Sequence, residues 1–224
     1  MRRLKQLIFG GSGNARASLS GDVRAALESW RLQPGADLDQ PHFHTRYVVV
    51  DVATAGLDSE RDAVLGVAGL GLGRGGIILP DDAFALDLPT SGEGDPELLD
   101  RQLTAFLLFA GRGPLVTYQV PFVGAFLERL FEERFGIHFQ PEWIDLAWLL
   151  PDLFKEKIDG LVPMDAWLEA FGIEVPGRRD ALADSVAIAR LLQVALPRAA
   201  ERGADTPGKL IDIGRARRWL RPSG

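Results

Sequence analysis

The chain contains no cysteine among its 224 residues, which excludes disulfide bonds and thiolate chemistry. This absence agrees with a cytoplasmic protein, which is the location we expect. Histidine is scarce as well: the chain has three, His42, His44 and His138. Few positions are therefore available for a histidine that acts as general base.

Long apolar stretches are also absent. No run reaches about 18 residues, so we expect no membrane span. The first apolar run, Leu7–Phe9, is too short for a secretory signal. Excess positive charge is lacking too, because 25 Lys and Arg face 31 Asp and Glu, a net charge of −6. This balance argues against a protein whose overall positive charge attracts nucleic acid, although it is compatible with a local basic surface.

The composition is that of an ordinary globular protein, with 46% hydrophobic and 25% charged residues. The length fits one α/β domain with modest extensions. We expect residues 1–45 to form a helical appendage and linker, with a helix over Asp22–Trp30. Residues 46–197 would form the main domain. Residues 198–224 would form a basic tail, with a short helix over Lys209–Leu220.

The order of predicted elements indicates a mixed α/β sheet. Apolar patterning and turn residues predict strands over Tyr47–Val52, Ala63–Leu72, Gly76–Leu88 (interrupted at Pro80) and Leu115–Tyr118. Helical spacing predicts helices over Asp95–Phe109, Val123–Phe135, Asp145–Phe154, Pro163–Phe171 and Ala181–Leu196. A hairpin turn is expected at the glycine-rich segment 73–76.

The most informative segment is residues 47–57, Tyr-Val-Val-Val-Asp-Val-Ala-Thr-Ala-Gly-Leu. It predicts a buried strand that ends in a carboxylate, Asp51, and then turns at a glycine. The segment resembles the first motif of the DnaQ-like 3′–5′ exonucleases of the DEDDh type. In that motif, Asp-x-Glu-Thr-Thr-Gly-Leu carries two metal-binding carboxylates. Here Asp51 matches the first, whereas Ala53 stands at the second.

Two further motifs follow in the expected order. Residues 116–123, Val-Thr-Tyr-Gln-Val-Pro-Phe-Val, resemble Val-x-His-Asn-x-x-Phe-Asp, with Phe122 retained and Val123 at the acidic position. Residues 179–184 resemble His-x-x-x-x-Asp, with Asp184 retained and Arg179 at the histidine position. The resemblance covers about residues 46–194 and implies a ribonuclease-H-like fold: three antiparallel strands, then parallel strands, with helices on both faces.

The replaced positions bear directly on catalysis. The family hydrolyses phosphodiesters with two divalent ions, Mg²⁺ or Mn²⁺, held by four carboxylates, and uses a histidine as base. This chain keeps Asp51 and Asp184, and has Ala53, Val123 and Arg179 at the other three positions. We therefore expect metal to bind weakly or not at all, and Asp51 and Asp184 to be its ligands if it binds. We also expect the Arg179 guanidinium to pair with Asp184 or Asp51.

Three functions stay open. The first is a catalytically impaired module that binds single-stranded nucleic acid or a nucleotide, for which the resemblance implies contacts at Thr54, Leu57 and Phe122. The second is an active exonuclease that recruits other carboxylates, with Asp145 and Asp180 the candidates. The third is a protein-interaction scaffold that contacts a partner or a second copy through residues 1–45 or the tail.

Overall fold

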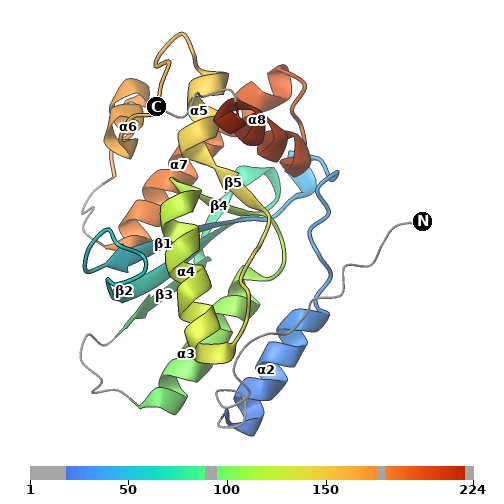
Figure 1. Cartoon of the computed structure of the whole chain (residues 1–224). Helices are drawn as coiled ribbons and strands as arrows, with labels where there is room; N and C mark the ends of the chain where they lie inside the picture. The colour runs from blue at the N-terminus through green and yellow to red at the C-terminus, as the bar shows by residue number, and fades with distance from the viewer. Residues whose placement is uncertain (1–18, 89–94, 176–179, 220–224) are drawn as a thin grey trace.

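The computed structural model describes residues 19–88, 95–175 and 180–219. Its centre is a five-stranded sheet in the order β3-β2-β1-β4-β5 (Figure 1). The strands are β1 (Tyr47–Thr54), β2 (Val64–Leu72), β3 (Ile78–Asp87), β4 (Leu115–Thr117) and β5 (Trp143–Asp145). The first three pair antiparallel, and β4 and β5 run parallel to β1. This topology confirms the predicted ribonuclease-H-like mixed sheet.

Helices cover both faces of the sheet. They are α2 (Gly21–Leu32), α3 (Pro96–Ala110), α4 (Val120–Phe135), α5 (Leu146–Leu153), α6 (Met164–Phe171), α7 (Ala181–Glu201) and α8 (Pro207–Trp219). Buried side chains of α5, α6, α7 and α8 form one apolar cluster, and those of α2, α3 and α4 form another. Strand β1 contributes to both, because alternate side chains point to opposite faces. Its Tyr47 and Val49 join the first cluster, and Val48 and Val50 join the second.

Helix α3 shows how the sequence sets the limits of an element. Asp95 caps the helix by accepting a hydrogen bond from the backbone N–H two residues on, at 2.9 Å, and Pro96 occupies the first turn. Phe106 and Leu107 are fully buried on the inner side. The helix ends at Gly111, whose φ of 67° suits a residue without a Cβ. Burying each large apolar side chain stabilises the fold by roughly 1.5–3 kcal/mol.

The structure corrects some of the predicted elements. Strand β5 was not expected, and it pairs with β4. Strand β3 is continuous from Ile78 to Asp87, but its pairing with β2 is interrupted around Pro80, because Leu70 lies opposite Ala83 and Leu72 lies opposite Ile78. Helix α7 continues past Pro197 to Glu201. Proline removes one hydrogen bond there, but the residues beyond it still pack in the core.

The two flanking segments share the core with the central sheet. Val23 and Leu27 of α2 belong to the cluster on the α3–α4 face, and Leu210 and Ile211 of α8 belong to the other. The division of the chain at residues 45 and 197 stays a prediction. Among the helices in the described part of the chain, none has the length and apolar character that a membrane crossing requires.

Candidate functional site

Asp51 lies on the face of β1 that α7 covers. Tyr47 and Val49 are buried in the cluster that contains the α5 and α7 side chains. Because side chains alternate along a strand, Asp51 continues this series toward the end of β1. It stands opposite Ala68 of β2 and is half-buried. The inner face of the strand thus passes from apolar side chains to a carboxylate.

Asp184 lies in the first turn of α7. Residues three and four positions on share a helix face, and here they are Ala187 and Ile188, both buried in the cluster against the sheet. Asp184 therefore begins the stripe of α7 that faces inward. Helix α7 contacts β1 (Figure 1). The two retained acids accordingly lie on facing surfaces of one strand and one helix.

Neither retained acid stands alone. Asp51 and Asp184 each have an interaction partner in the folded chain. Arg179, at the position of the family's histidine, lies outside the described residues, so its expected contact with either acid stays a prediction.

The other two acidic positions hold small or buried apolar side chains. Ala53 is half-buried on the same face of β1 as Asp51 and pairs with Gly66 of β2. Val123 lies in the first turn of α4, is 1% exposed, and belongs to the apolar cluster on the α3–α4 face. A methyl group and an isopropyl group offer a cation no ligand, so these two positions lower the number of available oxygens.

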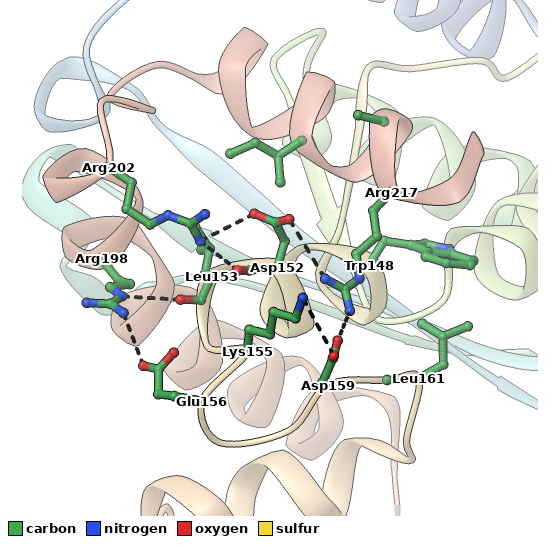
Figure 2. A pocket seen from close by; sticks show the side chains of 13 residues that line it. Trp148, Asp152, Leu153, Lys155, Glu156, Asp159, Leu161, Arg198, Arg202 and Arg217 are labelled. Atoms are coloured by element: carbon green, nitrogen blue, oxygen red, sulfur yellow. Dashed lines mark hydrogen bonds and ion pairs between the residues drawn. The ribbon is translucent and has the colours of Figure 1, made fainter. Parts of the chain in front are cut away.

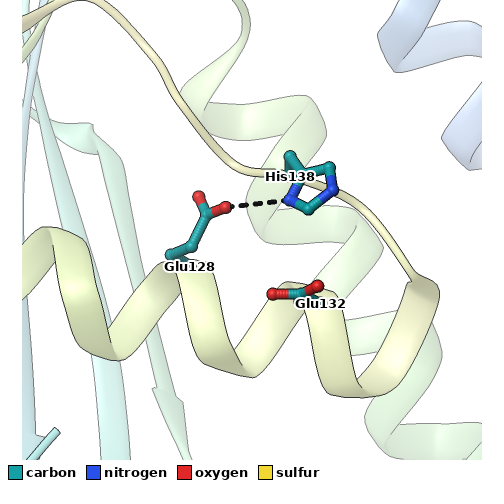
Figure 3. A group of neighbouring side chains, drawn as sticks. All are labelled: Glu128, Glu132 and His138. Atoms are coloured by element: carbon teal, nitrogen blue, oxygen red, sulfur yellow. Dashed lines mark hydrogen bonds and ion pairs between the residues drawn. The ribbon is translucent and has the colours of Figure 1, made fainter. Parts of the chain in front are cut away.

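The residues present do not fit a two-metal centre. Hard divalent cations need several oxygen ligands, and two ions need more charge than two carboxylates supply. In the described part of the chain, the group of three side chains able to share a metal is Glu128, Glu132 and His138 on α4 and the loop after it (Figure 3). That group includes neither Asp51 nor Asp184, and His138 contacts Glu128 at 3.2 Å.

The junction between β4 and α4 is held in an unusual conformation. Gln119 has φ 66° and ψ 70°, and among the described residues it alone has a positive φ without being glycine. Its N–H donates to Asp145 Oδ1 and the N–H of Val120 donates to Asp145 Oδ2, both at 3.0 Å. Such left-handed residues cluster at functional sites. The sequence interpretation did not predict this conformation, and glutamine has no preference for a positive φ that could have signalled it.

Asp145 serves as the anchor of this junction. Its carboxylate also accepts from the N–H of Ala147 at 3.0 Å and so caps α5. Burial raises the pKa of Asp145 above its ordinary value, while the three N–H donors and the charge of Arg218 oppose that rise. Asp180 is similarly engaged, since it caps α7 by accepting from the N–H of Ala183 at 2.8 Å. Both alternative carboxylates thus bind backbone.

The loop after β1 presents an exposed apolar side chain. Leu57 is 85% exposed. The loop around it is held by hydrogen bonds from Thr54 Oγ1 to Gly56 O at 2.7 Å and from the N–H of Asp58 to Asp62 Oδ2 at 2.8 Å. The Arg129 guanidinium of α4 donates to Asp62 O. Leu57 therefore projects from an ordered loop.

Phe122 is the third residue for which a nucleotide contact was predicted. It is half-buried in the first turn of α4, and its ring packs edge-on against Phe126 with 4.9 Å between ring centroids. This position leaves part of the ring accessible at the start of α4.

Comparison with known proteins assigns the fold. The sequence matches no protein-family model and no curated protein. The structure is similar to the nuclease domain of 3′hExo, a DEDDh family member bound to rAMP, with a TM-score of 0.54 and 15% identity over 75% of this chain and 97% of that one. It is similar to Exonuclease X in complex with 5′ overhanging duplex DNA, with a TM-score of 0.50 and 17% identity over 75% and 99%.

A third similar structure is the zinc-bound form of E. coli Exonuclease I with single-stranded DNA, with a TM-score of 0.53 and 14% identity over 72% of this chain. This chain covers 42% of the length of Exonuclease I. At these identities the likeness concerns the fold: the chain is built on the fold of the DnaQ-like 3′–5′ exonucleases.

Proposed function

We propose that this protein binds single-stranded nucleic acid or a nucleotide at the edge where β1 meets α7, and hydrolyses it poorly or not at all. The fold supports the binding, because structures of similar fold hold single-stranded DNA, duplex DNA with an overhang, or rAMP. A cytoplasmic location, in keeping with the lack of cysteine, is part of the same proposal.

One observation carries the loss of catalysis. Val123 is 1% exposed among apolar neighbours, at the position where the family has an acidic metal ligand. Together with Ala53 it leaves Asp51 and Asp184 as the retained acids, which is too little negative charge for two divalent ions. No catalytic step through a metal follows from these side chains.

The alternative nuclease, which would recruit other acids, has less support. Asp145 accepts three backbone hydrogen bonds and Asp180 accepts one at the start of α7. Turning either carboxylate toward a metal would leave backbone N–H groups without an acceptor, at about 1–3 kcal/mol for each buried group. A weakly bound Mg²⁺ or Mn²⁺ at Asp51 and Asp184 remains part of the proposal.

Leu57 supports binding of a base. It is a large apolar side chain, 85% exposed, on a hydrogen-bonded loop directly after the strand that carries Asp51. Because hydrogen bonds already fix the backbone of this loop, a base that packs on Leu57 orders only its side chain, at roughly 0.5–1 kcal/mol. We propose that Leu57 and the accessible part of Phe122 contact a base, and that Thr54 lies beside the sugar.

The test combines a hydrolysis assay with a binding assay. Labelled single-stranded DNA and RNA are incubated with the protein and Mg²⁺ or Mn²⁺, and we expect no shortening above that of a protein-free control. Fluorescence anisotropy with the same strands should show binding that weakens as salt rises. Leu57→Ala should weaken it by about fivefold to tenfold, on the scale of 1–3 kcal/mol for a stacked base.

Leu32→Ala is the matched control, because Leu32 is 76% exposed at the end of α2. It should leave binding unchanged. Robust metal-dependent degradation that Asp51→Ala abolishes would overturn the proposed loss of catalysis. Absence of binding to every strand would overturn the nucleic-acid proposal and favour the protein-interaction scaffold.

A further inference from the structure

The structure has a hollow whose lining includes neither Asp51 nor Asp184. It is enclosed by α5, the loop that follows α5, the last turns of α7, and α8, and it measures about 790 Å³ (Figure 2). Sites for small ligands commonly have this size. Apolar side chains of Leu153, Leu161 and Ile213 line part of it, and the ring of Trp148 lies beside them. The rest of the lining is charged.

Two arginines at the end of α7, Arg198 and Arg202, line the hollow. Arg198 lies in the last turn of α7, and Arg202 is the residue directly after Glu201, where the helix ends. Arg198 Nε donates to the carbonyl oxygen of Leu153 at 3.2 Å, and Arg202 Nη1 donates to that of Asp152 at 2.6 Å. These carbonyls end α5, where a helix favours cations. A neutral acceptor fixes the direction of a guanidinium without cancelling its charge.

Positive charge exceeds negative charge in the lining. Lys155, Arg198, Arg202 and Arg217 stand against Asp152, Glu156 and Asp159, four charges against three. Arg217 is used to hold α8, because it lies 2.7 Å from Asp159 and 3.8 Å from Asp152. Of the remaining cations, Lys155 is 70% exposed and lies 3.8 Å from Asp159.

Arg202 retains hydrogen-bonding capacity. Its Nη1 lies 3.3 Å from the carboxylate of Asp152 in addition to the carbonyl contact. Among the residues that the structure describes, its Nε and Nη2 have no hydrogen-bond partner. Arg198 is contacted by Glu156 at 3.1 Å, and that carboxylate is 58% exposed and free to swing into solvent. A stronger anion could therefore replace Glu156 at little cost.

We propose that this hollow binds a phosphate group, with Arg198 and Arg202 as a paired guanidinium clamp and Lys155 as the third cation. Guanidinium groups bind phosphate by two parallel hydrogen bonds. The apolar lining would take the rest of the ligand, which is a free nucleotide or one unit of a nucleic-acid strand. This site goes beyond the proposed function, since it contains none of the residues of the β1–α7 edge.

The experiment titrates the full chain with pyrophosphate, with AMP and with a 12-nucleotide oligo-dT at low salt. Calorimetry measures affinity, and tryptophan fluorescence, compared with that of Trp148→Phe, reports on the hollow itself. Arg202→Gln should weaken pyrophosphate binding by about tenfold or more, the effect of one lost charged hydrogen bond. Lys155→Gln, at an exposed position that folding tolerates, should weaken it by severalfold.

Glu156→Gln distinguishes a binding site from a group of ion pairs that only stabilises the fold. It removes the nearer of the two acids that pair with Arg198, since Glu156 lies at 3.1 Å and Glu201 at 3.9 Å. Phosphate binding should therefore tighten severalfold, whereas ion pairs that only support the fold would lose stability and gain no affinity. Arg74→Gln removes the same charge from the exposed turn between β2 and β3 and should change nothing. Unchanged pyrophosphate affinity in Arg202→Gln and Glu156→Gln would overturn the proposal, as would equal weakening by Arg74→Gln.

The two ligand sources give different results. If the site takes a strand, Arg202→Gln also weakens oligo-dT binding and lowers the slope of affinity against salt by about 1. If it takes a free nucleotide, AMP binding falls and oligo-dT binding does not. Leu57→Ala leaves pyrophosphate binding intact in either case, so failure at the β1–α7 edge and failure at this hollow are distinguishable.

Discussion

Val123 is a buried apolar residue at the position that the motif comparison aligns with an acidic ligand of the family. Its side chain is 1% exposed in the cluster that also holds Val50 and Phe126. We expect Val123→Asp to destabilise the fold by about 3 kcal/mol or more, because a carboxylate would be buried without a partner. Urea unfolding measures this, and Val123→Ala, which only removes methyl groups, should cost about 1–2 kcal/mol. An unchanged unfolding midpoint for Val123→Asp would mean that the position opens to solvent.

His42 gives the fold a pH dependence. It is 9% exposed; its Nε2 donates to Ala204 O at 2.8 Å, and its Nδ1 lies 2.6 Å from Tyr47 Oη, which then donates. Burial lowers the pKa of His42, and the positive charge of Lys209 lowers it further. The hydrogen bond to Ala204 and the negative charge of Asp205 oppose this shift. The neutral form is thus favoured in the folded state, so this contribution to stability is full above about pH 6.5 and is lost as pH falls through the lower folded pKa.

The His42 prediction is measured by urea unfolding between pH 7.5 and 5. The wild-type protein should lose stability toward pH 5 more steeply than His42→Gln, which itself should cost about 1–3 kcal/mol at pH 7.5 through the lost buried hydrogen bonds. His44→Gln, at an exposed neighbouring position, should behave as wild type. Parallel pH profiles for wild type and His42→Gln would contradict the assignment.

At the scale of elements, the sequence identified those whose pattern is long enough to show a period. Strand β1 and helices α3 and α7 were predicted because their apolar spacing extends over several turns or pleats. Strand β5 has three residues and runs directly into α5, so no turn separates it from the helix that was predicted to begin at Asp145. Strand β4 is equally short, but Gly113 and Pro114 mark its start. The end of α7 was misplaced because its last turns are held by core contacts, such as that of Ala199, which outweigh the effect of Pro197.

The turn from β4 into α4 leads to a testable prediction. Gln119 has φ 66°, a conformation that costs a residue with a Cβ about 1–2 kcal/mol. Gln119→Gly should relieve this strain, offset by the greater freedom of glycine when unfolded, so stability should rise or stay within about 1 kcal/mol. Gln119→Val should destabilise by about 2 kcal/mol or more, because β-branching disfavours this region. Thermal unfolding decides, and a large loss in the glycine variant would show that the Gln119 side chain itself holds the turn.

For the molecule as a whole, the sequence motifs predicted the candidate site residues but not the contacts around them. Asp51 and Asp184 were identified because sequence motifs keep their order and spacing. The anchoring of Gln119 by Asp145 was missed, since it joins residues 26 positions apart. The same holds for the hollow between α5 and α8, whose arginines and carboxylates come from three separate stretches of chain. Local patterns reveal candidate ligands, whereas partners distant in sequence decide what those ligands contact.

Restoring the family residues tests whether the whole molecule can still form a metal centre. The variant combines three substitutions, Ala53→Glu, Val123→Asp and Arg179→His. Its new carboxylates repel one another until a cation binds between them, so the stability of the variant should depend on metal. Mg²⁺ at about 100 times its Kd would add roughly 2.7 kcal/mol, a rise of about 5–10 °C in Tm for a chain of this size. Differential scanning fluorimetry with and without Mg²⁺ measures this, and wild type should shift little. The variant lacking only Val123→Asp is the control, and we expect it to respond less because one ligand is missing. Equal shifts in all three proteins would show that Mg²⁺ acts elsewhere on the surface, with the cluster of Glu128, Glu132 and His138 the first place to look.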